Sequence, residues 1–539
     1  MTDVIHKQSL IVPKFEEVLH PDKQAVEISL HGAQNVREHV VSAESHTSSG
    51  TAFAFTMPSQ TSLLDRTALL QAEVEVVITA SAANRAITTS EARRFGPEAY
   101  PLSRCMRNVN VSVNGATTST NPNLYQPALN RFHNNEYQRE MESYCPTEPD
   151  KQNNLALMLA SANNPLQIES ASVSDRDSRA SFPYTEVIDP VAADGVVSIA
   201  TRKYTLTQPI PHPVFVKSGH NTALTRVNNL RVDIQWGNLL SAFLGEGFVD
   251  ATAACTVTAR FTDTPAKLLL RTYEPSIEVP RNVIVPVTEP RMTSYNFSCA
   301  VNAQATVSTS NIVYPMVPKK LYVFASRQTE IDNHSSPDGW CALQSITMRT
   351  EANGGAFAGA SQQQLYQMSK RNSYQGSFNE WSKRSGSILC IDVASDLGGF
   401  VPGARTPFSF DLTAVFKNTF YSAYPHTVTT GDDSSPTNFR MYVLAIFDSK
   451  LSLDGTSGFY LSGVDGNEII ESLQRGYSDS HSNRMQLHDD GMGGGFGSFM
   501  KKLLHGGAKA GMFSKDPRIQ AGSALLGELT GGSIQKVSG

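Results

Sequence analysis

Several features are scarce in this chain of 539 residues, and each scarcity removes a class of protein. Its six cysteines are spread so widely that no two form a C-x-x-C pair, so neither a disulfide framework nor a zinc site is expected. No apolar run has the length of a membrane-spanning helix, and the N-terminal segment lacks the apolar core of a signal peptide. We therefore expect a soluble protein that is made in a reducing compartment.

Catalytic motifs are also absent. The sequence has no G-x-S-x-G, H-E-x-x-H or P-loop motif, and no G-x-G-x-x-G between a strand pattern and a helix pattern. His31, His39 and His46 cluster near the N-terminus, but their wide spacing is more typical of a solvated loop than of a metal site. We therefore expect that the protein is not an enzyme and that it has no catalytic residue, no cofactor and no metal ligand.

Charge is low and slightly acidic. Charged residues make up 18% of the chain, the net charge is -5, and the isoelectric point is near 6.2. Such a body does not attract phosphate as a whole, which argues against a protein that coats nucleic acid. The polar remainder is rich in Ser, Thr, Asn and Gln, which suits loops that face other proteins.

Alternation of apolar and polar residues is the commonest pattern in the chain and predicts β-strands. One example ends at Asn114-Gly115, the pair favoured for a two-residue type I′ turn, and therefore predicts a hairpin. The clearest alternating segments are 69–79, 107–113, 230–236, 255–261, 319–326, 408–416 and 439–448. Many short strands with few helices between them predict an all-β sandwich or jelly-roll architecture rather than parallel βαβ units.

A segment punctuated by prolines, 271–290, divides these strands into two series. Because proline cannot donate a ladder hydrogen bond, we expect no central strand there and place a domain boundary in this segment. The predicted parts are an N-terminal arm (1–24), a first β domain (25–272), a second β domain (273–477) whose closing helix spans 466–477, and a tail (478–539).

Three further helix and strand predictions concern segments between the alternating ones. Residues 361–372 predict a helix with Ser361 as N-cap and with Leu365, Met368 and Ser369 on one face. The nearly continuous apolar run 388–393 predicts a strand covered on both faces. Residues 123–143 predict one or two helices, broken at Pro127.

The tail is rich in glycine and differs in charge from the body. From Gly491 to Gly539 there are six basic and two acidic side chains, a net charge of +4. A short amphipathic patch there is a candidate for contact with a membrane or with packaged DNA, against the alternative of a disordered extension with scattered apolar residues. The patch consists of Phe496, Phe499, Lys501, Lys502, Leu503 and Leu504.

Four segments resemble the double jelly-roll major capsid proteins of polinton-like viruses and virophages. They are SLLDRTALLQAEVEVVI (62–78), RNVNVSVNG (107–115), the helix, tryptophan and buried strand of 361–399, and FRMYVLAIFDSKLSLDG (439–455). The resemblance implies two eight-stranded antiparallel jelly rolls, short inserted helices and a flexible tail. The chain departs from the family in its loops, notably in the Ser- and Asn-rich run 153–185.

The resemblance also implies a function. It implies a major capsid protein, assembled in the host cytoplasm or nucleus, that forms homotrimeric, pseudo-hexagonal capsomers in the icosahedral shell of a double-stranded DNA virus. Its partners would be neighbouring capsomers, penton and minor capsid proteins, and an internal membrane or DNA bound through the tail. Glycine doublets in the tail resemble sites of adenovirus-type maturation proteases and predict cleavage after Gly495, Gly507 or Gly532.

Two other functions remain open at this point. A minor or penton-type capsid component would share the same strands. A carbohydrate-binding jelly-roll attachment protein belongs to another class, and it would present exposed aromatic residues on a concave face. The chain has only three tryptophans, and Trp236 and Trp381 lie in or beside strand patterns.

Overall fold

The computed structural model describes the greater part of the body, and Met1–Leu473 forms one compact unit. No helix among the described residues has both the length and the apolar character needed to cross a membrane. The described residues are 11–16, 25–30, 35–59, 61–80, 95–97, 100–132, 184–189, 199–215, 223–245, 255–274, 283–300, 302–327, 341–351, 354–382, 387–398, 400, 402–403, 406–418, 437–453 and 458–461.

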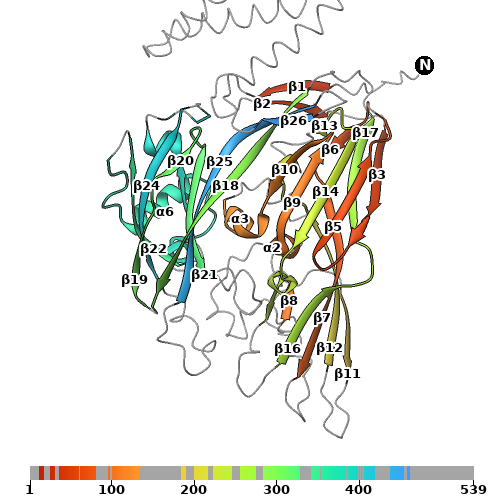
Figure 1. The fold of residues 1–539 in the computed structure, drawn as a ribbon, viewed down its shortest axis with the longest axis horizontal. Coiled ribbons are helices and arrows are strands. Elements are labelled where there is room, and N and C mark those ends of the chain that lie inside the picture. Colours follow the sequence, from red (N-terminus) through yellow and green to blue (C-terminus); the bar gives the residue numbers. More distant parts are fainter. Residues whose placement is uncertain are drawn as a thin grey trace, which may run out of the picture. The chain divides into compact units, whose positions relative to one another are not determined.

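The first half of the chain forms one β-sandwich, in which every strand pair is antiparallel (Figure 1). One sheet has the order β10 (Ala116–Thr120), β9 (Met106–Val113), β14 (Asn229–Trp236), β5 (Gly50–Thr56) and β4 (Ser45–His46). The other has the order β11 (Tyr184–Asp189), β12 (Ile199–Pro209), β7 (Leu69–Ala80), β17 (Lys267–Glu274), β6 (Leu63–Asp65) and β13 (Ala223–Leu224), with β16 (Cys255–Phe261) beside β7 and β3 (Asn35–Ser42) beside β17. Two small hairpins accompany them, β1 (Ile11–Glu16) with β2 (Ala25–Leu30) and β8 (Phe95–Pro97) with β15 (Phe243–Gly245).

The second half forms another antiparallel sandwich. One sheet has the order β18 (Val283–Cys299), β25 (Thr437–Leu453), β21 (Lys320–Arg327) and β23 (Leu389–Asp392), with β26 (Gly458–Leu461) beside β25. In the other, β24 (Phe408–Lys417) pairs with β19 (Gln304–Ser308), β20 (Ile312–Tyr314) and β22 (Ala342–Thr350). The helices are short: α2 (Pro101–Cys105), α3 (Pro122–Leu129), α6 (Gln362–Arg371), α7 (Phe378–Ser382), the 3-10 turns η2 (Pro213–Phe215) and η3 (Leu239–Ala242), and the π-helical turn η5 (Val393–Leu397).

The period-two prediction is confirmed in both sandwiches. In β7 the four residues predicted to face inward are at most 2% exposed: Ala72, Val74, Val76 and Ile78. In β24 the apolar residues alternate with more exposed neighbours in the predicted phase, from Phe408 to Phe416. Both strands thus bury one face, which is the arrangement that the alternation requires.

The predicted hairpin is present between β9 and β10. Val113 pairs with Ala116, and the turn residues Asn114 and Gly115 have φ of 49° and 86°. The Asn114 side chain is bonded to the neighbouring loop, since its Oδ1 accepts from the N–H of Asn228 at 2.7 Å. Positive φ at both central residues is what a type I′ turn needs, and Asn-Gly supplies it at low cost.

Each sandwich contributes residues to the core of the other. Val285 and Val287 of β18 and Leu451 and Leu453 of β25 lie in the core of the first sandwich. In return, α3 and Phe132 lie in the core of the second. At the same joint Gly458 of β26 donates its N–H to the carbonyl of Asn114 at 3.0 Å, and a Cβ on Gly458 would come within 2.7 Å of the carbonyl of Val113. The sandwiches are therefore coupled by shared apolar packing.

One prediction is wrong in detail, because helix α3 continues through Pro127 to Leu129 instead of breaking there. In the segment 271–290, β17 ends at Glu274, and β18 begins at Val283 and includes Pro286 and Pro290. These prolines do not lie in a central strand, as expected. Because β18 pairs with β25 alone among the main strands, it is an edge strand, where a missing N–H interrupts fewer ladder bonds. The predicted helix 466–477 lies outside the described residues.

Candidate functional site

The strand β23 is the centre of the candidate site because it is an edge strand in an unusually apolar setting. It pairs with β21 on one side, where Leu389 lies opposite Val323. No strand pairs with its other side among the described residues. Ile388, Leu389, Cys390 and Ile391 are nevertheless fully buried. Unpaired backbone groups in such a place cost free energy unless another group bonds to them.

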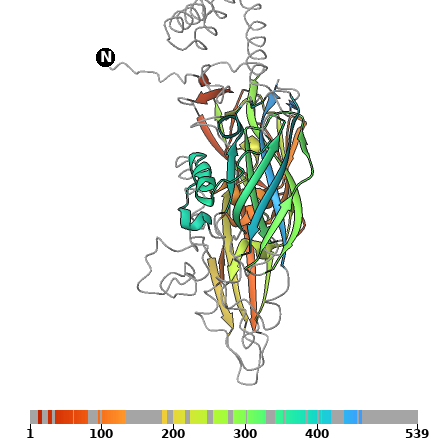
Figure 2. The ribbon, with the colours of Figure 1, turned by 90° about the vertical axis from the view of Figure 1, so that its left-hand side faces the viewer.

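Helix α6 covers this edge, and its sequence explains why it forms there. Ser361 accepts a hydrogen bond from the N–H of Gln364 at 3.3 Å, and the Gln364 side chain accepts from the N–H of Ser361 at 2.8 Å. This reciprocal pair is a capping box. Leu365, Met368 and Ser369 form the buried face, as the sequence predicts. Figure 2 shows α6 and α7 on the outside of the strands of the second sandwich.

Three side chains take the place of the missing strand. The Ser369 hydroxyl accepts from the N–H of Cys390 at 3.1 Å and lies 3.2 Å from the carbonyl of Ile388. Asn372 donates through Nδ2 to the carbonyl of Cys390 at 3.1 Å, and Trp381 donates through Nε1 to the carbonyl of Ile388 at 2.8 Å. These bonds satisfy the outer side of β23 and close it to any further strand.

The cysteine in β23 has a structural role. Burial raises the pKa of the Cys390 thiol to about 12, so the thiol stays protonated at neutral pH. A protonated, fully buried thiol is neither a nucleophile nor a metal ligand. The same holds for Cys105, whose pKa is also raised by burial to about 12. Both cysteines serve as small apolar side chains, as the sequence suggests for a thiol within the folded body.

An ion pair at the end of β23 fixes one further side chain. Asp396 is 3% exposed and accepts from the N–H of Asp392 at 2.8 Å and from Nδ2 of Asn372 at 2.9 Å. Its other oxygen pairs with Nη2 of Arg371 at 3.1 Å, while the Arg371 side chain remains 70% exposed. The buried Asp396 carboxylate thus fixes one side of the Arg371 guanidinium, and the rest of the side chain is exposed to solvent.

The strand β3 is an edge of the opposite kind. It pairs with β17 and, among the described residues, with no other strand. Val36 and Val40 on its outer face are 55% and 62% exposed. In Figure 1, β3 lies on the flank of the first sandwich that is farther from the second sandwich. Exposed apolar residues on a long edge strand mark a surface that can bind another chain.

Charged pairs border this edge. Glu38 pairs with Arg271 at 2.8 Å, and Arg37 pairs with Glu274 at 3.0 Å. Antiparallel pairing of β3 with an identical β3 centred on Glu38 would place Glu38 opposite Glu38. Like charges directly opposite destabilise a strand pair, so this register of self-pairing is disfavoured and a different surface of a partner suits β3 better.

The candidate site residues predicted from the sequence lie partly within and partly outside the described residues. Those of the tail lie outside the described residues: Gly495, Phe496, Phe499, Lys501, Lys502, Leu503, Leu504, Gly507 and Gly532. His31 also lies outside them. His39 bonds through Nε2 to Thr272, and His46 through Nδ1 to Thr51, both at 2.8 Å. Burial lowers the pKa of both imidazoles, and no cluster of possible metal ligands is found in the described part of the chain.

Sequence reasoning missed two other features. Arg66 is 2% exposed and donates to the carbonyls of Pro213 and Val214, both at 3.1 Å, so that it fastens the η2 loop. Phe357 lines a groove of about 880 Å³ beside α6. The only signal for the groove is one aromatic residue within a run of glycine and alanine. Nothing local in the sequence distinguishes Arg66 from an exposed arginine.

Comparison with known proteins gives these features a context. Residues 17–232 match the family described as the Sputnik virophage major capsid protein first domain, and residues 290–422 match the major capsid protein V20 C-terminal domain. The putative capsid protein V20 of Sputnik virophage is 21% identical, with 96% of this chain and 90% of that protein covered. The two matched domains follow one another in the order of the two sandwiches.

Solved structures agree with these matches in fold. The Sputnik virophage structure determined by cryo-EM is similar with a TM-score of 0.68 at 18% identity, over 92% of this chain and 96% of that one. The mavirus major capsid protein is similar with a TM-score of 0.64 at 15% identity, over 80% and 92%. The fold class is therefore confirmed as mostly β, with antiparallel sheets in a double jelly roll. The chain belongs to the double jelly-roll major capsid proteins of virophages of the Sputnik and mavirus type.

Proposed function

We propose that this capsid protein assembles as a homotrimer with a pseudo-hexagonal outline, and that the β3 edge forms part of the contact between copies. As a member of its family the chain is a structural component of the virion, in the icosahedral shell of a double-stranded DNA virus, and not an enzyme. Two coupled sandwiches per chain give six lobes in a trimer. That count suits a hexagonal outline.

The observation that carries the proposal is the open, partly apolar edge of β3. Val36 and Val40 are exposed at this edge. At β23, in contrast, three side chains of the same chain form hydrogen bonds with the outer backbone groups. A contact between different surfaces of two copies forms a ring when the rotation between them closes. Stable interfaces of this kind bury on the order of 2,000 Å² or more, which requires more surface than β3 alone.

The test is the mass and outline of the purified chain. Native mass spectrometry and negative-stain imaging should give trimers with a hexagonal projection. Monodisperse monomers at micromolar concentration would overturn the proposal. Trimers that persist when Val36 and Val40 are both replaced by Asp would preserve the oligomer but remove β3 from its interface.

We further propose that the tail faces the interior of the shell and contacts a membrane or packaged DNA. Its support is the sequence pattern of Phe496, Phe499, Leu503 and Leu504 beside Lys501 and Lys502. Basic amphipathic segments bind anionic surfaces through combined apolar and ionic contacts. Full-length protein should float with anionic vesicles, and the variant Phe496→Ser with Phe499→Ser should not. Equal flotation of the two proteins would reject the idea.

We also propose that the tail is cleaved after Gly495, Gly507 or Gly532. Its support is the resemblance of these three sites to those of adenovirus-type proteases. Intact-mass measurement of protein from virions should give a chain that ends at one of these glycines. A chain that ends at Gly539 would dismiss it.

The boundary between the domains at residues 272 and 273 and the wider set of partners stay predictions as well. We propose neighbouring capsomers, a penton protein and minor capsid proteins as those partners. Cross-linking of intact particles followed by mass spectrometry would identify them. Cross-links confined to copies of this chain would contradict the penton and minor-protein contacts.

A further inference from the structure

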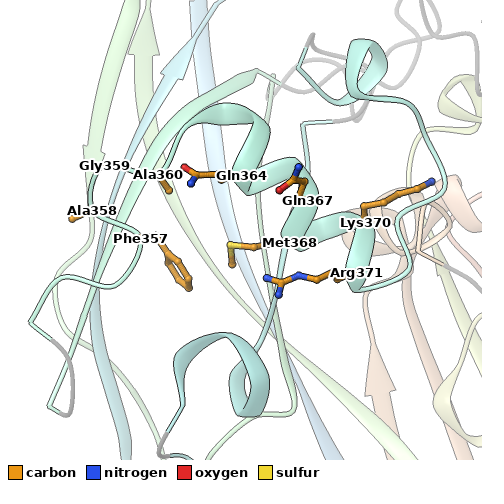
Figure 3. Close-up of a pocket in the computed structure, with 9 residues that line it drawn as sticks. All are labelled: Phe357, Ala358, Gly359, Ala360, Gln364, Gln367, Met368, Lys370 and Arg371. Carbon is orange, nitrogen blue, oxygen red and sulfur yellow. The ribbon is translucent and has the colours of Figure 1, made fainter.

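The groove beside α6 is built from residues of mixed chemistry. It lies between the loop 354–360 and the helix, and its volume is about 880 Å³ (Figure 3). Met368 is its one buried lining residue, Phe357 is half-buried, and Gln364, Gln367 and Arg371 are exposed. Figure 3 shows Phe357 and Met368 on facing walls, with the Arg371 side chain reaching across toward Phe357. An aromatic ring, amides and a guanidinium therefore converge on one open space.

Phe357 is held in a conformation that large residues avoid. Its φ is 65°, and the loop is fixed by hydrogen bonds from the N–H of Ala358 to the carbonyl of Gly355 and from the N–H of Ala360 to the carbonyl of Phe357. A bulky residue at positive φ is strained, and such residues concentrate at ligand-binding positions. The loop thus keeps an aromatic ring at the groove although glycine would suit the backbone better.

The rest of the loop leaves the ring accessible. A Cβ on Gly354 would meet nothing within 4 Å, and one on Gly355 would meet only Ala358, at 3.8 Å. Neither glycine has φ in the left-handed region, so the fold does not require glycine at these positions. Larger residues there would narrow the space above the groove.

Hydrogen bonds within the protein orient some of the polar side chains that line the groove. Arg371 is oriented by Asp396, which engages Nη2, and this leaves the remaining guanidinium donors for a ligand. The Gln364 oxygen is held by the N–H of Ser361, so its amide nitrogen remains as a donor. Lys370 also lines the groove, but in Figure 3 its ammonium end points away from Phe357, and its Nζ lies 3.5 Å from the carbonyl of Gln375. Arg371 is therefore the cation that a bound anion would meet.

We propose that this groove binds an acidic sugar, with its carboxylate on Arg371, its ring against Phe357 and its hydroxyls on Gln364 and Gln367. A guanidinium matches a planar carboxylate, and side-chain amides both donate to and accept from hydroxyls. An apolar peptide anchor would need a deep, dry pocket, whereas only Met368 of this lining is buried. The capsid protein would then bind glycans in addition to building the shell.

The test measures sugar binding by saturation-transfer NMR on the full chain, with 3′-sialyllactose as the acidic probe and lactose as the neutral control. We expect binding of 3′-sialyllactose at least tenfold tighter than that of lactose. Phe357→Gly removes the ring and suits the positive φ, so it should fold normally and weaken binding at least tenfold. Arg371→Gln should do the same, and thermal melting checks whether the loss of the partner of Asp396 disturbs folding.

Arg349→Gln is the matched control, because it removes an exposed positive charge of β22 that does not line the groove. It should bind the acidic probe as the wild type does. Equal affinity for both sugars, no detectable binding of either, or full binding by Phe357→Gly would overturn the proposal. Loss of trimers in Phe357→Gly, with sugar binding unchanged, would instead assign the groove to contact between copies. The comparison of the two sugars does not depend on whether the wild type is trimeric.

Discussion

Strand β23 in the second sandwich and strand β3 in the first each have one side without a neighbouring strand among the described residues, but only β23 has side chains bonded to that side. Ser369, Asn372 and Trp381 satisfy β23 from within the chain. The hydrogen bonds of the β3 side chains lead to β17, and its outer face carries exposed Val36 and Val40. An edge closed by its own helix belongs to the fold, whereas an open, partly apolar edge is available for assembly.

The largest expected effect comes from opening the closed edge. Trp381→Ala removes a fully buried ring and its bond to Ile388, and should lower the free energy of unfolding by about 3–5 kcal/mol. Urea unfolding measures this loss. Phe378→Ala on the same helix, where the residue is 38% exposed and its ring centroid lies 5.4 Å from that of Tyr366, is the control and should lower stability by only about 1–2 kcal/mol. Equal losses in the two variants would show that the helix, and not its contact with β23, matters.

A smaller change tests the side-chain bonds by themselves. Ser369→Ala leaves the buried N–H of Cys390 without its acceptor and should cost about 1–3 kcal/mol. Hydrogen exchange of the Cys390 amide should accelerate accordingly. Ser308→Ala, at an exposed hydroxyl on β19, is the control and should leave exchange in β23 as it was. An unchanged Cys390 amide in Ser369→Ala would mean that β23 is protected by burial alone.

Acid should act on the sandwich that carries β3. His212 is fully buried, its Nδ1 accepts from the N–H of Val214 and its Nε2 faces the carbonyl of Thr118, both at 3.3 Å, so it holds the neutral Nε2–H tautomer. Burial lowers its pKa to about 3. The hydrogen bond to the carbonyl of Thr118 acts in the opposite direction, but burial has the larger effect on this pKa.

The sign of this effect follows from proton binding. Below pH 6.5 the unfolded chain binds a proton at His212, whereas the folded chain does not. The contribution of neutral His212 to the free energy of unfolding is therefore fully present above pH 6.5 and is lost progressively as the pH decreases toward 3. The loss from His212 should reach about 1.4 kcal/mol at pH 5.5. Burial lowers the pKa of His39 and His46 in the same direction. Urea midpoints at pH 7.5 and 5.5 measure it. A His212→Asn variant with the same dependence on pH as the wild type would refute the assignment.

The smallest effect on stability is expected at the open edge. Replacing Val36 and Val40 together by Asp should change the unfolding free energy of the monomer by at most about 0.5 kcal/mol, because both side chains are mostly exposed. It should nevertheless weaken trimer formation at least tenfold in analytical ultracentrifugation. Val187→Asp, on the edge strand β11 and 60% exposed, is the control and should assemble normally. Assembly impaired equally in both variants would point to a general effect of charge.

The sequence predicts the strands well because burial of one face imposes a period of two. It also predicts α6, since Ser361 and Gln364 form the capping box and Leu365 and Met368 form one face. The turn at Asn114-Gly115 follows from the preference of these residues for positive φ. All these signals lie within a few residues along the chain.

The error at α3 comes from an effect that depends on distant residues, since Pro127 is tolerated because the helix is short and packs into the second core. Pro286 and Pro290 lie in the edge strand β18, which agrees with the expectation of no central strand there. Which side chains would bond to β23, and which edge would stay open, depends on how the sheets are ordered. The groove beside α6 likewise unites a loop and a helix through tertiary contact, and no local pattern in the sequence reveals it.

Hydrogen exchange in the assembled capsomer, compared with the Val36→Asp, Val40→Asp variant, tests the difference between the two edges most directly. The amides of β3, residues 35–42, that point away from β17 should be protected in the capsomer and exchange rapidly in the variant, while amides of β23, residues 389–392, should be protected in both. Rapid exchange of β3 within intact trimers, or protection of β23 that appears only on assembly, would contradict the account.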